Sequence, residues 1–163
     1  MPHHNQALNI LPPPTDVEIV DSLCTSGLDT FCLVADSVFS SIDQYISDLH
    51  REGKATRWVV PSERSIPAIA VGRWLATGQQ TVMMMQNSGF SNAMDYLRTV
   101  MMMHRVPGLM LVGWRGHDAT LDDSEPHILV GDLTEHDTAG TLGSSHVFGH
   151  RDGKALGRLL SLP

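Results

Sequence analysis

Hydrophobic residues along this chain follow two alternating patterns. Short apolar runs of strand length stand at residues 31–34, 58–60, 81–85 and 109–112, and between them apolar residues recur at the three- and four-residue spacing of helices. Strands that alternate with helices at this spacing are typical of a parallel sheet with right-handed crossovers. The pattern therefore predicts an α/β fold of three layers, with a doubly wound and mostly parallel sheet.

Capping residues mark the start and the end of the first predicted helix. Thr15 and Glu18 have the spacing of a capping box, which satisfies two free N–H groups at a helix start, and Gly27 is placed to end the same helix. Three prolines precede it, so we predict a flexible leader over residues 1–14. The remaining residues, 15–163, are predicted to form one domain without an internal repeat or a linker.

The alternation becomes weaker after the fourth strand. We predict a polar loop over residues 117–127, a helix after Thr134, a strand over residues 146–148 and a helix over residues 152–160. These segments repeat the order of strand and helix seen earlier in the chain.

Polar turns follow the second and third predicted strands. The second strand leads through Pro61 and Ser62 to Glu63, and the third ends in the Gln-Asn-Ser-Gly of residues 86–89. In an open parallel sheet such turns lie at the carboxyl ends of the strands, where a ligand crevice forms and helix N-termini present free N–H groups. Gly89 would let the backbone come close to a ligand. The alternatives are an exposed acid at a helix N-terminus for Glu63 and an ordinary capped turn for residues 86–89.

The helix predicted over residues 66–76 is rich in small residues. Ala68, Ala70 and Gly72 lie at spacings that let another backbone approach closely. The pattern indicates either helix packing on the chain's own sheet or a contact between subunits.

Composition excludes several classes of protein. The chain is 42% hydrophobic and 18% charged, which is typical of a globular domain. Its net charge is −7 and its 11 Lys and Arg residues are scattered, so we expect no nucleic-acid partner. No apolar run approaches the ~20 residues that span a bilayer, and we expect no membrane contact and a cytoplasmic location. Cys24 and Cys32 lack CxxC spacing and are interpreted as buried free thiols.

Other site chemistries lack their motifs. The nearest histidine cluster is His136, His146 and His150, but no HExxH pattern occurs, and we predict no metal ligands in this chain. The absence of Gly-x-Ser-x-Gly and of a Gly-rich phosphate loop disfavours a hydrolase or a nucleotide-binding module. The methionine runs are most simply core-filling residues.

Several short motifs stand in a fixed order along the chain. They are Glu63, the Ala-Val-Gly of residues 70–72, the Met-Gln-Asn-Ser-Gly of residues 85–89 with Asn92, the Val-Gly-Trp-Arg-Gly of residues 112–116, and Glu125-Pro126 with His127 and Gly131. Together they resemble the pyrimidine-binding (PYR) domain of thiamine diphosphate enzymes. Within that superfamily the sequence is most similar to phosphonopyruvate and sulfopyruvate decarboxylases, and to the alpha subunit of the latter, which consists of this domain alone. The resemblance runs from about residue 29 onward.

The resemblance implies roles for two of these motifs. Glu63 is expected to meet a ring nitrogen of the aminopyrimidine of thiamine diphosphate and to promote its imino tautomer, which then removes the thiazolium proton. Gln86, Asn87, Ser88 and Gly89 are expected to bind the same cofactor. The chain would then belong to a thiamine diphosphate-dependent carboxy-lyase.

The other half of such an active site has no recognisable motif here. No Gly-Asp-Gly with a downstream asparagine occurs, and Gly131-Asp132-Leu133 is the nearest string. The resemblance implies that a partner, the diphosphate-binding (beta) subunit, holds the diphosphate through Mg²⁺, and that this chain is inactive without it. Self-association of the PYR domains is also expected.

The resemblance implies an anionic 2-oxo acid as substrate, either 3-sulfopyruvate or 3-phosphonopyruvate. Candidate substrate-binding residues are Asp36 and Ser37, which follow the first strand and could cap the next helix, and Arg115 and His127 near the fourth. The planar guanidinium of Arg115 can bond two oxygens of an anionic group, and His127 could add a donor or handle a proton. Alternatively, Arg115 pairs with acidic residues of the following loop and His127 braces that loop.

Two departures from the family pattern bear on activity. Arg64 follows Glu63 where small residues are common, and Asp95 stands where a second asparagine is common. Arg64 is placed to pair with Glu63 and to favour its charged form over the protonated one. This supports the alternative of a non-catalytic binding or regulatory domain that kept the fold. A subunit that serves another 2-oxo acid is a further alternative.

Overall fold

The structure is a computed structural model that describes residues 14–116, 127–131, 133–134, 144–149 and 156–162. Its elements, in chain order, are α1 (Asp16–Thr25), β1 (Thr30–Leu33), the 3₁₀ turn η1 (Ser37–Phe39), α2 (Ser40–Arg51), β2 (Thr56–Val59), α3 (Ser65–Thr77), β3 (Val82–Gln86), α4 (Asn87–Tyr96), the π-helical stretch η2 (Leu97–Met102), β4 (Gly108–Trp114), β5 (Ser144–Gly149) and β6 (Leu156–Leu162). Residues 127–131 and 133–134 are also helical.

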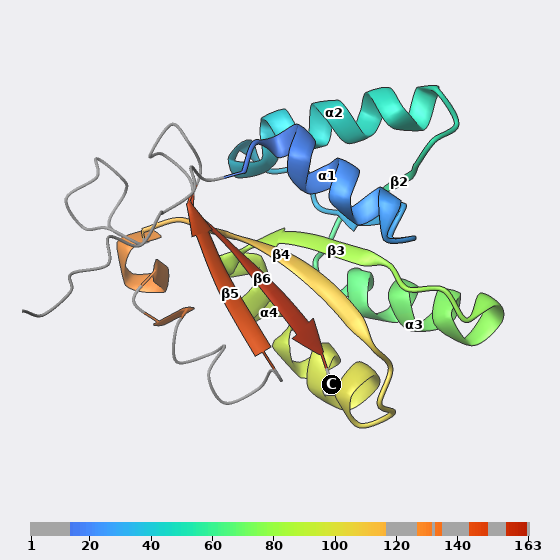
Figure 1. Cartoon of the computed structure of the whole chain (residues 1–163). Helices are drawn as coiled ribbons and strands as arrows, with labels where there is room; N and C mark the ends of the chain where they lie inside the picture. Colours follow the sequence, from blue (N-terminus) through green and yellow to red (C-terminus); the bar gives the residue numbers. More distant parts are fainter. Residues whose placement is uncertain (1–13, 117–126, 132, 135–143, 150–155, 163) are drawn as a thin grey trace, which may run out of the picture.

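The sheet has the strand order β2-β1-β3-β4-β6-β5. The first four strands in this order pair in parallel, whereas β6 is antiparallel to both β4 and β5. Helices α1 and α2 cover one face of the sheet, and α3 and α4 cover the other (Figure 1). The predicted α/β fold with three layers and a mostly parallel sheet is confirmed.

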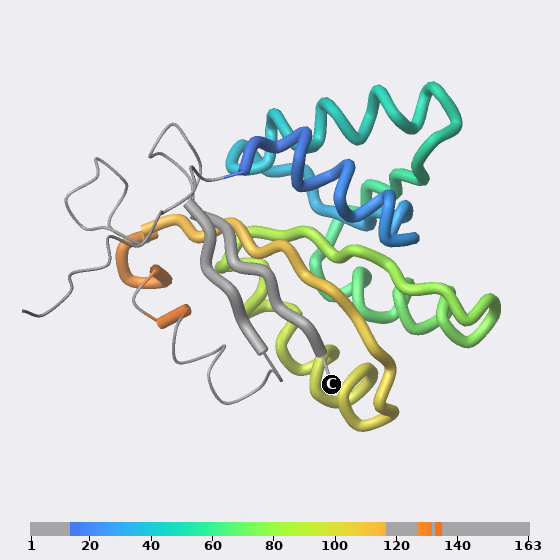
Figure 2. The backbone as a smooth tube through the Cα atoms, in the orientation of Figure 1, coloured from blue at the N-terminus to red at the C-terminus, as the bar shows by residue number. Residues whose placement is uncertain are grey.

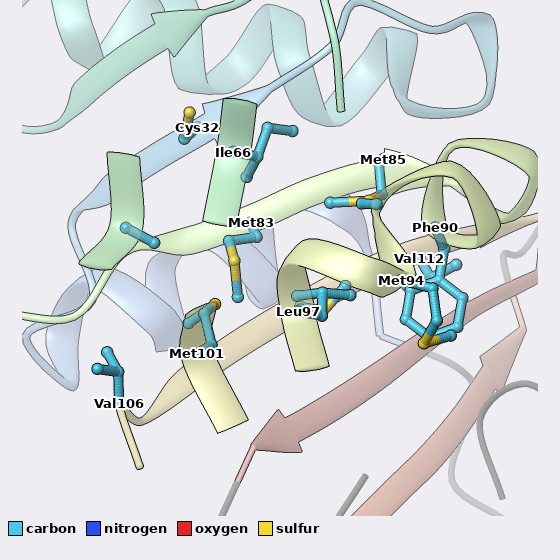
Figure 3. Packing of buried hydrophobic residues seen from close by; sticks show 13 residues of the cluster. Cys32, Ile66, Met83, Met85, Phe90, Met94, Leu97, Met101, Val106 and Val112 are labelled. Atoms are coloured by element: carbon cyan, nitrogen blue, oxygen red, sulfur yellow. The ribbon is translucent and has the colours of Figure 1, made fainter. Parts of the chain in front are cut away.

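Alternate side chains of the parallel strands enter two separate hydrophobic cores, as the period of two in a strand requires. The core under α3 and α4 takes Cys32, Met83, Met85, Met110 and Val112, and the core under α1 and α2 takes Phe31, Leu33, Val82, Met84 and Leu111. Figure 3 shows the first of these cores, in which methionines of β3 and of the helices meet. The methionine runs are therefore core residues, except that Met103 is 74% exposed.

The connections after β1 and β3 leave the sheet on opposite faces. The chain passes from β1 through α2 to β2 on one face, and from β3 through α4 and η2 to β4 on the other (Figure 2). Because β1 and β3 are neighbours, their carboxyl ends form a switch point, where open α/β sheets hold their ligands.

The predicted ends of α1 are confirmed. The Thr15 hydroxyl accepts a hydrogen bond from the Glu18 N–H at 3.2 Å, and the Glu18 carboxylate accepts one from the Thr15 N–H at 2.7 Å. Gly27 follows the helix with a φ of +82°, a left-handed conformation that favours glycine. The capping box and the glycine therefore define this helix as predicted.

At the end of the chain, the strand predicted over residues 146–148 is confirmed by β5, and the helix predicted over residues 152–160 is wrong. Residues 156–162 form a strand, where the sequence pattern predicts a helix over residues 152–160. The strand pairs with β4 along its whole length, from Gly108 opposite Leu162 to Trp114 opposite Leu156. This pairing satisfies the backbone groups along β4, and such a long-range contact overrides the helical spacing of a short apolar run.

Three predicted segments lie at least partly outside the residues that the structure describes. The flexible leader over residues 1–14 lies outside the described residues except for Pro14, and so do residues 117–126 of the polar loop and the start of the helix after Thr134. Within the described parts of the chain, no helix is long and apolar enough to cross a membrane.

Candidate active site

The predicted site residues lie where the parallel strands end. Asp36 and Ser37 follow β1, Glu63 follows β2, residues 86–89 span the end of β3, and Arg115 follows β4. Because these strands run in the same direction, the residues share the carboxyl edge of the sheet. The sequence pattern therefore placed the candidate residues on one edge correctly.

Glu63 is half-buried and packs against the first turn of α4. A Cβ atom at Gly89 would lie 2.5 Å from Cγ of Glu63, 2.8 Å from its Oε1 and 2.9 Å from its Cδ. Such distances are too short for a methyl group at position 89 unless the Glu63 side chain moves away. The group that comes close to Gly89 in this structure is thus the Glu63 side chain, and the approach of a ligand to Gly89 stays a prediction.

A chain of hydrogen bonds joins Glu63 to Arg64 through Asn92. The amide Nδ2 of Asn92 donates to Oε2 of Glu63 at 3.2 Å, and Nε of Arg64 donates to Oδ1 of Asn92 at 2.9 Å. The direct pairing of Arg64 with Glu63 that the sequence suggested is therefore wrong. The pairing through which Arg64 favoured a non-catalytic domain is therefore not formed among the described residues, and whether the domain is catalytic stays a prediction.

The second oxygen of Glu63 stays open. No residue that the structure describes forms a hydrogen bond with Oε1. The carboxylate is therefore held by one oxygen and can offer the other to a ligand.

Gln86 presents a buried donor at the end of β3. Its Oε1 accepts a hydrogen bond from the Ser88 hydroxyl at 2.7 Å. Its Nε2 is buried and finds no partner in the described part of the chain. A buried donor without an acceptor is costly, by about 1–3 kcal/mol, so an acceptor on a bound ligand would stabilise this site.

Asn87 serves the protein's own structure. Its side chain is buried, and Nδ2 donates to the Arg115 carbonyl at 2.9 Å and to the Thr134 hydroxyl at 3.0 Å. The strand β3 runs directly into α4, whose N-cap residue Gln86 makes no side-chain cap hydrogen bond. The alternative of an ordinary turn capped by Asn87 or Ser88 is therefore wrong.

Two glycines let the helical residues 127–131 lie on the end of β4. A Cβ at Gly116 would be 2.0 Å from the His127 carbonyl oxygen, and one at Gly131 would be 2.1 Å from the Gly116 carbonyl oxygen. The indole Nε1 of Trp114 donates to the Gly131 carbonyl at 3.0 Å and secures this crossing. The sequence showed these glycines as parts of two motifs, but gave no sign that the motifs contact each other.

Arg115 and His127 lie at this crossing. Both are half-buried and both make further interactions in the structure. The acidic residues suggested as partners of Arg115, namely Asp122, Asp123 and Glu125, lie outside the described residues.

Asp36 and Ser37 line a polar hollow of about 400 Å³ beside α2. Asp36 caps the short turn η1, with Oδ1 accepting a hydrogen bond from the Val38 N–H at 2.8 Å, whereas the following helix α2 has Phe39 as N-cap and no side-chain cap. Arg57 also lines the hollow, and its guanidinium donates to both oxygens of Asp43 at 2.6 and 2.7 Å, which raises the pKa of Arg57. With two carboxylates and a single guanidinium, this hollow lacks the cationic donors that an anion needs.

Both cysteines of the chain are free thiols. Cys32 is buried and Cys24 is half-buried, and both are free, so the prediction of two buried thiols is right for Cys32. Among the described residues, no group of three or more His, Cys, Asp or Glu side chains could hold a metal ion.

The fold and this edge define an α/β domain with a candidate ligand site at a topological switch point. No family model matches the sequence. The chain is 30% identical over 123 residues to a phosphonopyruvate decarboxylase from Streptomyces viridochromogenes, which covers 72% of this chain and 30% of the relative. It is 32% identical over 96 residues to a phosphonopyruvate decarboxylase from Streptomyces hygroscopicus, with 56% of this chain and 22% of the relative covered.

The comparison with solved structures gives a partial match. A structure from Mycobacterium smegmatis assigned as a thiamin diphosphate-dependent enzyme aligns with a TM-score of 0.44 and 26% identity, over 52% of this chain and 16% of that one. The sequence relatives confirm the resemblance to phosphonopyruvate decarboxylases. The chain spans less than a third of the length of these relatives.

Proposed function

We propose that this chain is the PYR (alpha) subunit of a two-subunit, thiamine diphosphate-dependent 2-oxo acid decarboxylase that acts on 3-sulfopyruvate or 3-phosphonopyruvate. One observation carries the proposal, namely that Glu63 rests on Gly89 and is bonded to Asn92 while its Oε1 accepts no hydrogen bond from the residues that the structure describes. The sequence relationship to phosphonopyruvate decarboxylases supports decarboxylation of a 3-substituted pyruvate.

The residues present fit an aminopyrimidine ring. Such a ring offers a nitrogen that can share a proton with a carboxyl group and further nitrogens that can accept a hydrogen bond. Glu63 has an open oxygen for the first, and the buried Nε2 of Gln86 lacks an acceptor among the described residues. In this proposal Gln86 and Ser88 contact the cofactor, and Gly89 makes room for Glu63. Asn87 holds the end of β4 in place through its hydrogen bond to the Arg115 carbonyl.

Glu63 is the proposed general acid–base group. When bound, thiamine diphosphate supplies the carbon nucleophile that adds to the 2-oxo group and the ring that takes up the electron pair left by CO₂. Glu63 holds a proton at a ring nitrogen of the aminopyrimidine through Oε1. General acid–base groups of this kind contribute about 10²–10⁴ in rate.

The diphosphate and its Mg²⁺ are assigned to a partner, the diphosphate-binding (beta) subunit. The relatives contain far more chain than the matched region, which supports a second half of the site outside the residues matched here. The two free thiols suit the reducing cytoplasm, where we place the complex.

Arg115 is the proposed ligand of the sulfonate or phosphonate, with His127 beside it. Arg115 lies at the carboxyl edge, and its fork can bond two oxygens at once. Asp36 and Ser37 are less suited to this anion, because their hollow carries an excess of negative charge.

Self-association is proposed to use the outward face of α3. Ala68, Gly72, Leu75 and Ala76 are exposed on this face, and Leu75 is 76% exposed. Arg73 is the sole charged residue within α3, and its side chain is only 14% exposed. A helix that is apolar on all sides is typically buried. Two copies of a chain with a net charge of −7 repel each other, and a face without charged side chains keeps this repulsion low where they meet. We therefore assign this face to a second copy of the chain.

The test is reconstitution with the partner subunit. The chain alone should bind thiamine diphosphate weakly and show no turnover, whereas the mixture with the partner, Mg²⁺ and the cofactor should decarboxylate sulfopyruvate or phosphonopyruvate. Pyruvate serves as the control substrate. Turnover by the purified chain alone would contradict the proposal.

A further inference from the structure

Three groups meet where α3 begins and α4 completes its first turn. Glu63 and Arg64 precede α3, and Asn92 lies three residues after Gly89 on α4. Residues three apart lie on one face of a helix, so Gly89 and Asn92 together form the surface on which Glu63 rests. Gly89 supplies the space and Asn92 supplies a hydrogen bond.

The chemistry of the neighbours fixes which way the Asn92 amide points. An arginine can only donate hydrogen bonds, and an ionised carboxylate can only accept them. Arg64 therefore requires Oδ1 of Asn92, at 2.9 Å from Nε, and leaves Nδ2 for Glu63 at 3.2 Å. The reverse orientation would set Oδ1 against the carboxylate and Nδ2 against the guanidinium, and would lose both bonds.

Asn92 and Arg64 are exposed, so water competes for their hydrogen bonds. Both bonds of the Asn92 amide go to charged groups, and such bonds are stronger than those between neutral groups. Nδ2 of Asn92 donates to Oε2 of Glu63, and this hydrogen bond fixes the orientation of the carboxylate group. In that orientation Oε1 has no partner among the described residues.

We propose that Asn92 and Arg64 are positioning residues for Glu63: Arg64 sets the orientation of the Asn92 amide, and Asn92 fixes Oε2 so that Oε1 faces the cofactor. This inference rests on the proposed function of Glu63. It also explains why an arginine follows the glutamate in this chain, where the family has small residues.

Two substitutions of Arg64 separate its donor from its charge. In Arg64→Gln the amide nitrogen takes the place of Nε, so the donor stays and the charge is lost. In Arg64→Met a methyl group takes that place, so both are lost. Asn92→Ala removes the link itself, and Tyr96→Phe, at an exposed position of the same helix, is the control.

The first readout is the side-chain amide signal of Asn92 in ¹H–¹⁵N NMR spectra of the chain alone. We expect Arg64→Met to shift this signal and Arg64→Gln and Tyr96→Phe to leave it near its original position. An unshifted signal in Arg64→Met would overturn the role of Arg64, and an equal shift in Arg64→Gln would assign the effect to charge instead of the donor.

The second readout is exchange of the C2 proton of thiamine diphosphate for deuterium in the reconstituted complex. We expect Asn92→Ala and Arg64→Met to slow it about ten-fold, the effect of losing one hydrogen bond to a charged group, and Arg64→Gln and Tyr96→Phe to stay within about two-fold. Unchanged exchange in Asn92→Ala, with exchange lost in Glu63→Gln, would overturn this inference and leave the proposed function standing. Unchanged exchange in Glu63→Gln would instead contradict the proposed function, and the NMR signal would still decide whether Arg64 orients Asn92.

Discussion

Glu63 lies so close to Gly89 that a Cβ atom at position 89 would stand 2.5 Å from its Cγ and 2.8 Å from its Oε1. The two residues come from different helix starts and are 26 positions apart in the sequence (89 − 63). The absence of a side chain at Gly89 therefore leaves room for the Glu63 carboxylate at the edge of the sheet.

Gly89→Ala should inactivate the site without unfolding the protein. Alanine favours a helix over glycine by about 1 kcal/mol, and the half-buried Glu63 side chain can swing away from the new methyl group. We expect the free energy of unfolding in urea to change by less than about 1 kcal/mol. Cofactor C2 exchange in the complex should fall about 100-fold, as for loss of an acid–base group. Full exchange activity in Gly89→Ala would show that the position of Glu63 does not matter.

Gly72→Ala should stabilise the separated chain and weaken its self-association. No atom lies within 4 Å of a Cβ built at Gly72, so the methyl group meets nothing in this chain and adds about 1 kcal/mol of helix propensity. In a dimer it would hold the partner helix away. Leu75→Ser should weaken association in the same way, whereas Val17→Ala on α1 should not. Sedimentation velocity that reports the same oligomer for all three variants would refute the assignment of this face.

Arg115→Lys should change substrate selection more than turnover. Lysine keeps the charge but loses the planar fork that bonds two oxygens. The KM values for sulfopyruvate and phosphonopyruvate should therefore rise about ten-fold, as for loss of one charge-assisted hydrogen bond, while the KM for pyruvate stays nearly constant. An equal rise for all three substrates would instead assign Arg115 to the contact between the end of β4 and residues 127–131.

Cys32 should resist alkylation in the native state. Burial raises the pKa of its thiol to about 11, whereas its ordinary value is 9.0, so almost no thiolate forms at pH 8. Mass spectrometry after iodoacetamide treatment should find Cys24 labelled first. Cys32 should react only after unfolding, and rapid native labelling of Cys32 would contradict its burial.

The same pKa difference predicts a loss of stability at high pH. The unfolded thiol loses its proton near pH 9 and the folded one near pH 11. The contribution of Cys32 to the free energy of unfolding is therefore fully present below about pH 9 and declines between pH 9 and pH 11. Urea denaturation across this range should show a shallower decline for Cys32→Ala than for the native chain, and identical slopes would contradict the prediction.

The sequence predicted the sheet well because each strand carries its own signal. The apolar runs and the residues that follow them identify β1 to β4 and place Glu63 and Gln86 at their ends. Contacts between such ends depend on how α3 and α4 pack, which no local pattern encodes. The Glu63–Gly89 and Gly116–Gly131 contacts were therefore visible only in the structure.

Two errors have the same physical origin. The residues of β6 have apolar spacing that also suits a helix, and pairing with β4 decides for a strand. Arg64 is next to Glu63 in sequence, yet the Asn92 amide stands between their side chains in space. In both cases a partner distant in the chain overrides the local preference.

The most direct test of the central claim uses Glu63→Gln in the reconstituted complex with thiamine diphosphate and Mg²⁺. The substitution keeps the shape and the bond to Asn92 but removes the acid, and Glu52→Gln, at the exposed end of α2, is the matched control. We expect deuterium exchange at C2 of the cofactor to fall by about 10²–10⁴ in Glu63→Gln and to stay unchanged in Glu52→Gln, with the same oligomer size for both. Exchange at the native rate in Glu63→Gln would contradict the account.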